Sequence, residues 1–435
     1  MFLGWRGIVL ALSALGALVG CGGPSPDGRG SGEMPAAVPR APAVGADTTA
    51  AVAVADTGRM RRPVAAPVYI APRALWIVRH DLADPKHLAG AVDWAAAAGF
   101  TDLLVQVRGR GDAYYRSDLV PRAEDLRGEA TRDPLAEAIA LARARGLRVH
   151  AWINVSLTWS AARLPRAPDH VARAHRDWFV WIQTRGQAPR NSFDLKKREL
   201  NAMELEGHFL IPGHAAADAH LEAVVREIVQ RYPLLDGLHL DYARLPRAVK
   251  SLDPESRAVF RARYGVDPTG LSAKRLAAGD TVAIAWYRFH EERVTALVAR
   301  LAVAARAVHP GITVSAAVYP DPVAARRERA QDWDRWLADG TIDVAAPMCY
   351  AADPAVARAD LRVARAATTG RLWAGLGLYN KSLDEALAGA ALARELGYEG
   401  VALFSHTAAR EKGLRAKTAI AAALAGFAAA GTVVK

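Results

Sequence analysis

The sequence has few cysteines and no dense cluster of basic side chains. Two cysteines among 435 residues exclude a disulfide-stapled scaffold and a cysteine-built zinc site. The net charge is +11, but the basic residues form no block and no ribbon with aromatic residues, so the sequence does not predict nucleic-acid binding. The arginine-rich excess fits the codon bias of a GC-rich genome, and an anionic partner is the alternative. An apolar content of 51% excludes a wholly disordered chain.

The N-terminal apolar run, Ile8–Val19, is too short to span a membrane. It has about a dozen residues, whereas a spanning helix needs about 20. Arg6 precedes the run, so residues 1–20 are predicted to be a secretory signal peptide. The segment Leu18–Cys21 resembles the bacterial lipobox, in which small residues precede an acylated cysteine. We therefore expect Cys21 to be lipidated; an ordinary signal peptide followed by a chance cysteine is the alternative.

Residues 21–72 are predicted to be a disordered linker. They are rich in proline, alanine, glycine and serine, with almost no large apolar side chain before Tyr69. Such a segment buries too little surface to offset the entropy lost on ordering. Gly22 rather than aspartate follows Cys21, which favours the outer membrane where the cell has one. We expect a lipid-anchored protein of the cell envelope, with its folded part outside the cytoplasm.

Residues 73–435 repeat one unit eight times: a short apolar run, a polar loop and an amphipathic helix. This pattern predicts an α/β fold, a closed (β/α)8 TIM barrel, with a doubly wound open sheet as the alternative. Long third and fourth βα loops are expected to form lids or cleft walls. The predicted strands are Ala74–His80, Asp102–Arg108, Arg148–Val155, Gly237–Tyr242, Ile312–Tyr319, Ile342–Tyr350, Arg371–Tyr379 and Gly400–His406. The predicted helices are Asp84–Gly99, Asp133–Gly146, Ala217–Tyr232, Trp286–His309, Gln331–Gly340, Asp353–Thr368, Ser382–Gly397 and Ala408–Ala430.

Side-chain alternation along four strands separates an apolar face from a polar face. The apolar faces suit the surrounding helices, so the polar faces should point into the barrel, near the C-terminal mouth where such barrels carry their sites. A structural polar network is the alternative. The residues of these polar faces are Gln106, Arg108, His150, Trp152, Asn154, His239, Asp241, Ser315, Ala317 and Tyr319.

Several ordered motifs resemble those of the bacterial glycosyl-hydrolase-like family ten. They are Gln106–Ser117, Asp133–Leu135, His150–Asn154, Pro212–Gly213, Asp236–Pro246 and Pro347–Tyr350. The resemblance covers nearly all of residues 73–435. It implies a glycosidase-like (β/α)8 barrel, commonly exported and often lipid-anchored, and it loosely implies cell-wall glycans as substrate. Two departures stand out: the fifth strand ends in Tyr319-Pro320-Asp321, and no glutamate stands at a strand end.

Glycoside hydrolysis needs two carboxyl groups that flank the scissile bond. Asp241, at the end of the fourth predicted strand, is our first catalytic candidate, and a neighbouring Arg108 is expected to hold it ionised, which suits a nucleophile or base. Asp321 has the matching position on the adjacent strand and is our candidate for the general acid, provided that burial or the charge of Asp241 raises its pKa. Asp112, in the second βα loop, is the alternative partner.

The other polar and aromatic residues near the mouth are expected to bind substrate. His150 could instead be a satisfied strand-end histidine, Arg108 only a counter-ion and the tryptophans core residues, although aromatic rings in a polar cleft suit stacking on sugars. The expected substrate-binding residues are Gln106, Arg108, Asp112, His150, Trp152, Asn154, His239, Tyr242, Arg244, Tyr319, Tyr350 and Tyr379.

Three functions compete on this sequence. The leading hypothesis is an exported glycoside hydrolase that needs no cofactor and acts on a polysaccharide, plausibly peptidoglycan glycan strands. The second is a non-catalytic carbohydrate-binding lipoprotein, which the missing glutamate favours. The third is a metal-dependent hydrolase built on His80, His150, His239 and Asp241, but the sequence contains no His-x-His or His-Glu-x-x-His pair, and no metal is expected. Protein partners are not predicted.

Overall fold

The computed structural model describes residues 71–430, apart from residues 185–186, 248 and 414. The predicted signal peptide, Cys21 and nearly all of the predicted linker lie outside the described residues. Within the described part of the chain, no helix is both long enough and apolar enough to cross a membrane.

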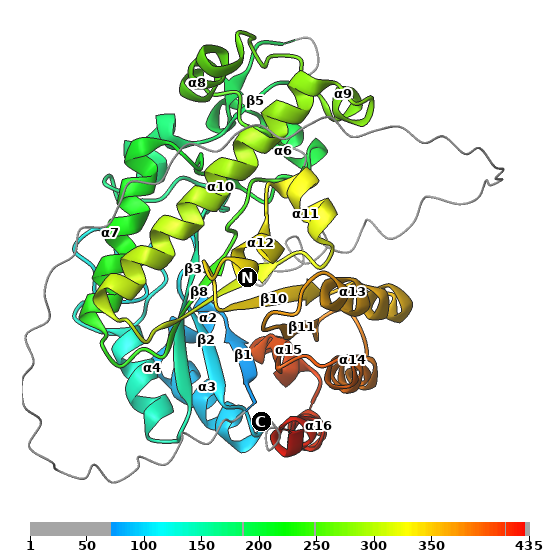
Figure 1. The fold of residues 1–435 in the computed structure, drawn as a ribbon. Helices are drawn as coiled ribbons and strands as arrows, with labels where there is room; N and C mark the ends of the chain where they lie inside the picture. Colours follow the sequence, from blue (N-terminus) through cyan, green and yellow to red (C-terminus); the bar gives the residue numbers. More distant parts are fainter. Residues whose placement is uncertain (1–70, 185–186, 248, 414, 431–435) are drawn as a thin grey trace, which may run out of the picture. The chain divides into compact units, whose positions relative to one another are not determined.

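Eight parallel strands close into a barrel (Figure 1). Hydrogen bonds connect them in the order β1, β12, β11, β10, β9, β8, β3 and β2, and β2 pairs again with β1. Closure, which sets Arg73 beside Val401, confirms the predicted barrel and excludes the open sheet. The strands are β1 (Arg73–Ile77), β2 (Asp102–Arg108), β3 (Arg148–Asn154), β8 (Gly237–Asp241), β9 (Thr313–Val318), β10 (Val344–Cys349), β11 (Trp373–Gly377) and β12 (Gly400–Phe404).

Helices follow the strands and surround the barrel (Figure 1). The glycines expected to end four helices, at positions 99, 146, 340 and 397, all have positive φ angles. The helices are α2 (Arg79–Leu82), α3 (Pro85–Ala97), α4 (Pro134–Arg143), α7 (Ala215–Arg231), α10 (Thr281–Val308), α11 (Pro322–Arg329), α12 (Trp333–Ala338), α13 (Pro354–Ala366), α14 (Leu383–Glu395), α15 (His406–Glu411) and α16 (Ala416–Ala430).

Three predicted boundaries were wrong. The first strand ends at Ile77 rather than His80, because the chain turns into α2. Helix α10 begins at Thr281, because Asp280 caps it with hydrogen bonds from two backbone N–H groups. The last predicted helix is two helices, α15 and α16, separated near Gly413, whose φ of +87° is incompatible with a continuing helix.

The third and fourth βα loops are long, as predicted, and carry their own elements. In the third, β4 (Leu157–Trp159) pairs antiparallel with β7 (His208–Phe209), and β5 (Trp181–Ile182) pairs with β6 (Arg190–Asn191). The same loop holds α5 (Val171–Ala174), α6 (Lys197–Ala202) and the 3₁₀ helices η1 (Arg176–Trp178) and η2 (Ser192–Asp194). The fourth holds α8 (Pro254–Tyr264) and α9 (Ala273–Ala277). Figure 1 shows α6, α8 and α9 gathered at one end of the molecule.

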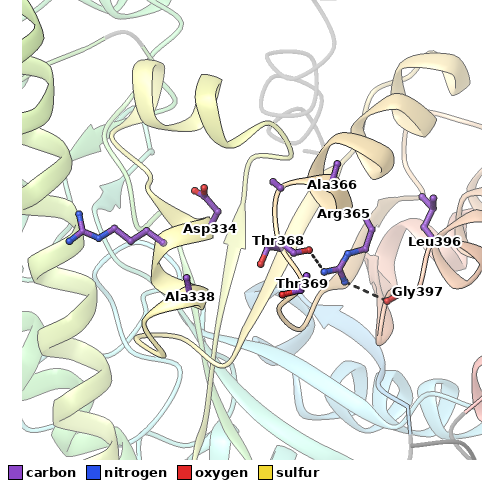
Figure 2. Close-up of a pocket in the computed structure, with 10 residues that line it drawn as sticks. Asp334, Ala338, Arg365, Ala366, Thr368, Thr369, Leu396 and Gly397 are labelled. Carbon is purple, nitrogen blue, oxygen red and sulfur yellow. Dashed lines mark hydrogen bonds between the residues drawn. The ribbon is translucent and has the colours of Figure 1, made fainter. Parts of the chain in front are cut away.

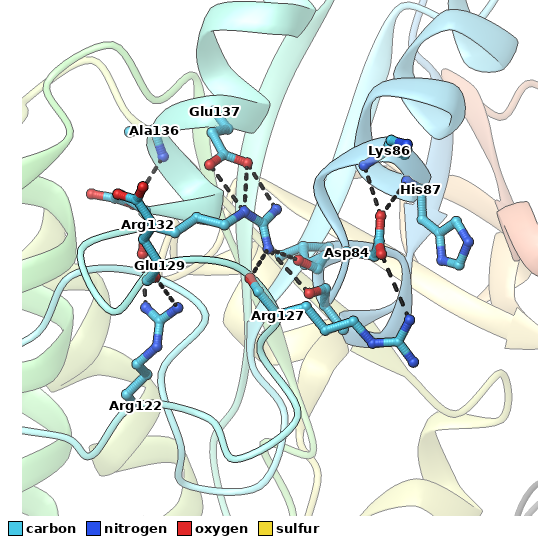
Figure 3. A network of polar contacts seen from close by, with 12 residues as sticks. Asp84, Lys86, His87, Arg122, Arg127, Glu129, Arg132, Ala136 and Glu137 are labelled. Carbon is cyan, nitrogen blue, oxygen red and sulfur yellow. Dashed lines mark hydrogen bonds and ion pairs between the residues drawn. The ribbon is translucent and has the colours of Figure 1, made fainter.

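The second βα loop is fixed by a network of polar contacts (Figure 3). Arg132 donates hydrogen bonds to the Glu137 carboxylate and to the Leu82 carbonyl oxygen at 2.9 Å, which joins the loop to α4 and to the end of α2. Asp133 accepts a hydrogen bond from the Ala136 N–H at 3.1 Å and so caps α4. The network therefore fixes the segment between β2 and α4.

The barrel strands keep the predicted division between apolar and polar faces. Val149 and Leu238 belong to the large apolar cluster between the strands and the helices. Trp76, Trp152 and Trp373 belong to a separate cluster inside the barrel. Successive side chains along each strand thus point alternately to the outer core and to the barrel interior. The polar side chains of β3 and β8 point to the interior.

Candidate active site at the barrel mouth

Polar side chains of β2, β3 and β8 meet at the C-terminal end of the barrel. The parallel register places Asn154 beside Asp241. Asn154 Oδ1 accepts hydrogen bonds from the Trp152 indole nitrogen at 3.1 Å and from Gln106 Nε2 at 3.4 Å. The structure therefore brings these sequence-predicted residues together at the opening where (β/α)8 enzymes carry their sites.

Asp241 is the last residue of β8, and an unusual backbone conformation follows it. Tyr242 has a φ of +51°, in the left-handed region that bulky residues rarely adopt. Such a conformation costs roughly 1–3 kcal/mol and persists only where surrounding contacts enforce it, most often at functional sites. The Tyr242 N–H donates a 2.7 Å hydrogen bond to Asp241 Oδ1, so the strained backbone also orients the carboxyl group.

Asp241 is a buried residue, 9% exposed, and the environment of its carboxyl group favours the protonated form. Burial raises its pKa from 3.8 to about 6. The Arg244 guanidinium, the Tyr242 N–H and the Trp152 indole lower this pKa, whereas the negative charge of Glu206 raises it. Asp241 can therefore carry a proton in mildly acidic solution, as a general acid must.

A β-bulge moves Arg108 away from its expected position. The register between β2 and β3 shifts just before Arg108, which then pairs with the outward-facing Ile153. Arg108 Nη1 donates a 2.5 Å hydrogen bond to the Asn154 carbonyl oxygen. The expectation that Arg108 holds Asp241 ionised is therefore wrong: Arg244 is the cation that acts on Asp241, and it does not outweigh burial.

Arg244 contacts several side chains at the barrel mouth beside β8. Its buried guanidinium donates a 3.0 Å hydrogen bond from Nη2 to Glu206 Oε1. The guanidinium also lies 4.4 Å from the centroid of the Tyr242 ring and 5.4 Å from that of the Tyr319 ring. A second arginine, Arg329, lies 3.7 Å from the centroid of the Tyr319 ring. The predicted residues Arg244, Tyr242 and Tyr319 are thus in contact, together with two charged residues that sequence reasoning missed.

Glu206 was missed because acids were sought at strand ends. It lies in the third βα loop, between α6 and β7. The available signal was a glycine, Gly207, followed by the apolar run Phe209–Ile211, which indicates that the loop returns to the barrel core. The sequence does not show which strand end such a return reaches, so the pairing with Arg244 could not be foreseen.

The two other candidate acids have different surroundings. Asp321 is exposed, and its Oδ1 accepts hydrogen bonds from the backbone N–H groups of Val323 at 2.8 Å and Ala324 at 3.1 Å, so it caps α11. Asp112 is buried in the second βα loop, where it accepts a 3.1 Å hydrogen bond from the Arg110 N–H. Both acids therefore have a local structural task.

The two interior histidines lie deeper than the mouth. His239 accepts a 3.2 Å hydrogen bond from Trp76, and its Nδ1 lies 2.9 Å from Ser315 Oγ; burial lowers its pKa to about 3. His150 lies beside Gly237, at the start of β8, and its Nε2 is 3.0 Å from Asp102. The expectation that His150 stands at the mouth was wrong. Among the described residues, no group of three His, Cys, Asp or Glu side chains could hold a metal ion.

Aromatic rings form the opposite wall of the mouth, at the ends of β10, β11 and β12. The ring centroid of Tyr350 lies 6.2 Å from that of Tyr379 and 5.6 Å from that of Phe404. Burial raises the pKa of Tyr350 well above its usual value, with further contributions from Tyr379 and Asp241. A rigid wall of neutral aromatic side chains suits the apolar faces of sugar rings.

A groove elsewhere on the surface does not belong to this site (Figure 2). Its lining comes from α12 and from the ends of α13 and α14, where Arg365 donates hydrogen bonds to the carbonyl oxygens of Thr368 and of Gly397. These segments lead into β11 and β12, so the groove lies where the strands begin. Sites of (β/α)8 enzymes lie at the opposite end.

Comparison with known proteins identifies the family. The model of the glycosyl hydrolase-like 10 family matches residues 72–374, which is most of the folded region. The chain belongs to this family. Within it, the chain is similar to the glycosyl hydrolase DigH of Escherichia coli K12, with 26% identity over 290 residues, covering 60% of this chain and 56% of DigH. It is also similar to the glycosyl hydrolase YngK of Bacillus subtilis, with 27% identity over 175 residues, covering 39% of this chain and 30% of YngK.

Solved glycosidase barrels share the fold of this glycosyl hydrolase-like 10 protein. The PgaB (BpsB) glycoside hydrolase domain of Bordetella bronchiseptica superposes with a TM-score of 0.57 at 14% identity, covering 81% of this chain and 98% of that domain. The β-amylase catalytic domain of Paenibacillus polymyxa gives 0.52 at 11% identity, covering 78% and 94%. The barrels show a shared fold, and membership of the glycosyl hydrolase-like 10 family supports a glycosidase-like function. The chain spans little more than half of DigH, so the substrate is a matter for proposal.

Proposed function

We propose that this protein is an exported, lipid-anchored glycoside hydrolase that cleaves a polysaccharide, with bacterial cell-wall glycan strands as the substrate class. The observation that carries this proposal is the buried carboxyl group of Asp241 at the mouth of a closed barrel, with a pKa raised to about 6. Cleavage of a glycosidic bond requires an acid that protonates the leaving oxygen, and this acid must still carry its proton in mildly acidic solution. Membership of the glycosyl hydrolase-like 10 family supports the same reaction class.

The geometry of the mouth and the raised pKa of Asp241 support the following reaction, in which Asp241 is the general acid rather than the nucleophile or base expected from the sequence. Asp241 donates its proton to the glycosidic oxygen as the bond from that oxygen to the anomeric carbon breaks, while a second carboxylate activates water or attacks the carbon. Tyr350 and Tyr379 are assigned to stacking on the sugar rings, and Asn154 and Gln106 to hydrogen bonds with hydroxyl groups. The sequence-based candidate for the second carboxyl group is Asp321, although its Oδ1 already caps α11.

The envelope location rests on the N-terminal sequence. Cys21 follows a lipobox-like segment, and lipid chains on this residue would anchor the barrel to a membrane. Cells that express the chain are therefore expected to incorporate labelled fatty acid into it, and Cys21→Ser is expected to abolish this labelling. Unchanged labelling of the Cys21→Ser variant would reject the anchor without affecting the proposed reaction.

The direct test of the activity compares three purified full-length proteins on a panel of glycans: wild type, Asp241→Asn and Asp218→Asn. Asp218 is the matched control, because burial also raises its pKa to about 6, but it lies on α7 and contacts the Gly213 N–H and Arg300 rather than the cluster around Asp241. Wild type and Asp218→Asn should release reducing ends at similar rates. Asp241→Asn should lower the rate by about 10²–10⁴-fold, the usual contribution of a general acid.

The second candidate function is a non-catalytic carbohydrate-binding lipoprotein. The observation that favours it is the exposure of Asp321 and its use as a helix cap, which leaves the sequence-based candidate for the second carboxyl group engaged with the backbone of α11. This function predicts that wild type and Asp241→Asn bind glycans equally and that neither releases reducing ends. That result would overturn the proposed hydrolase.

A further inference from the structure

Glu206 reaches the barrel mouth from the long third βα loop. Its Oε1 lies 3.0 Å from Arg244 Nη2, and the Arg244 guanidinium lies 4.4 Å from the ring of Tyr242, the residue that follows Asp241. The Tyr242 N–H in turn holds Asp241 Oδ1. One chain of contacts therefore connects the carboxylate of Glu206 with the carboxyl group of Asp241.

The backbone around Glu206 is fixed to the end of β8. The backbone N–H of Ser156, which follows β3, donates a 3.1 Å hydrogen bond to the Tyr242 carbonyl oxygen, and the Ser156 carbonyl oxygen accepts one of 2.8 Å from the Leu210 N–H. At Gly207, a Cβ atom would lie only 2.3 Å from the Trp159 carbonyl oxygen, so glycine permits the close approach of the loop. Such rigid placement is what a group that must meet a reacting atom needs.

One oxygen of Glu206 is unused. Oε1 is bound to Arg244, whereas Oε2 is buried and has no hydrogen-bond partner among the described residues. Buried carboxylate oxygens are almost always paired, so an unpaired one is costly and calls for an explanation. The side chain as a whole is 17% exposed, which leaves an approach from the mouth. The negative charge of Glu206 also acts on Asp241 and raises its pKa.

The other candidate acids fit this role less well. Asp321 uses Oδ1 to cap α11 and is exposed, and Asp112 is tied to the Arg110 N–H of its own loop. We propose that Glu206 is the second catalytic carboxyl group, acting with Asp241 on opposite sides of the scissile glycosidic bond. This inference rests on the proposed hydrolase function and names the residue that completes its site.

The hydrolytic step balances with these two groups and one water molecule. Asp241 gives its proton to the glycosidic oxygen, which leaves as a hydroxyl group when its bond to the anomeric carbon breaks. The Glu206 carboxylate takes a proton from water, whose oxygen bonds to the anomeric carbon. The two acids thereby exchange protonation states, and solvent restores them. Arg244 keeps the Glu206 carboxylate oriented between turnovers.

The test compares full-length wild type with Glu206→Gln, Asp321→Asn, Asp112→Asn and the control Glu204→Gln. Glu204 lies two residues before Glu206 and pairs at 3.3 Å with the more exposed Arg247. Glu206→Gln should lower reducing-end release about 10²–10⁴-fold, and the control Glu204→Gln should change it less than about tenfold. Asp321→Asn and Asp112→Asn should each lower it less than Glu206→Gln does. Thermal unfolding of each variant identifies any loss that comes from misfolding.

Azide rescue separates chemistry from structural support. In Glu206→Ala, azide can take the vacant place of the carboxylate and attack the anomeric carbon, so this variant should form a glycosyl azide that wild type does not form. A Glu206→Gln variant as active as wild type, or a rescue seen instead with Asp321→Ala, would overturn the assignment and leave the proposed function standing. A wild type inert on every glycan would instead reject the proposed function.

Discussion

Two buried aspartates inside one barrel, Asp102 and Asp241, have opposite environments. Asp102, 1% exposed, lies at the start of β2, where burial alone would raise its pKa; hydrogen bonds from His150 and Arg148 outweigh burial and hold this pKa well below its ordinary value. Asp241, 9% exposed, lies at the end of β8, where the effect of burial exceeds that of its hydrogen bonds and of Arg244, and its pKa rises to about 6. Both aspartates are buried, so the difference in their protonation comes from the hydrogen-bonding and charged groups that surround each carboxyl group.

The difference separates a fully paired carboxylate from the one to which we assign the proposed reaction. The two oxygens of Asp102 are 2.7 Å from Arg148 Nε and 2.6 Å from Thr101 Oγ1, and His150 Nε2 is a further partner. Asp241 has a single backbone donor and a cation, Arg244, that is itself bound to Glu206. An acid left without full pairing at a strand end is available to exchange a proton with a ligand.

The largest expected effect is on activity and stability together, in Asp241→Asn. We expect activity to fall about 10²–10⁴-fold. The rise in the pKa of Asp241 from 3.8 to about 6 means that its ionisation costs the folded chain about 3 kcal/mol above pH 6 and nothing below about pH 4. The variant should therefore be more stable than wild type at pH 7.5, by up to this amount, and equally stable at pH 4 in urea unfolding. Lower stability at pH 7.5 would make Asp241 a structural carboxylate like Asp102.

Asp102→Asn should have the opposite consequence. Removal of one member of a buried ion pair costs about 3–5 kcal/mol, so this variant should be much less stable at pH 7. The lowered pKa of Asp102 stabilises the fold above the unfolded-state pKa, and this contribution disappears as the pH falls through the folded-state pKa, so the deficit should shrink in acid. Folded protein should keep its turnover rate; a loss of turnover without loss of stability would contradict the structural role.

Gly207→Ala should displace the loop that carries Glu206. Its Cβ would lie 2.3 Å from the Trp159 carbonyl oxygen, so the backbone must move. A shift of about 1 Å can cost about 10²-fold in rate, while overpacking costs about 1–3 kcal/mol in stability. The matched control is Gly90→Ala on α3, where a Cβ meets open space. Unchanged kcat for Gly207→Ala would show that the position of Glu206 is irrelevant to the reaction.

The smallest effect is the pH dependence of the wild type. A general acid works only while protonated, so kcat/KM should fall about tenfold per pH unit above pH 6, where Asp241 loses its proton. Asp218→Asn should leave this limb of the profile in place. A rate that rises through pH 6 would assign Asp241 the role of a base instead.

The sequence predicted the barrel well because its determinants are local. Alternation along β3 and β8 depends only on the two-residue period of a strand, and it correctly aimed Trp152, Asn154 and Asp241 inward. Gly99 and Gly146 marked helix ends because few other residues accept positive φ there.

The predictions that were wrong or missing concern features that depend on contacts between distant parts of the sequence. The bulge before Arg108 is set by the pairing of β2 with β3 and has no signature in either strand alone, so the counter-ion of Asp241 was assigned wrongly. Glu206 required knowledge of where a long loop returns to the barrel. Asp321 stands at the expected strand end, but its backbone contacts, rather than its position, decide that it caps α11.

The most direct test of the account is a carbon-13 NMR titration of the aspartate carboxyl groups in the full-length protein, with Asp241→Asn used to assign the resonance of Asp241. We predict that this resonance titrates near pH 6, while that of Asp102 stays in the ionised position down to the acid limit of the fold. A resonance of Asp241 that titrates below pH 4 would contradict the central claim, because an acid already ionised at the working pH has no proton to give to a glycosidic oxygen.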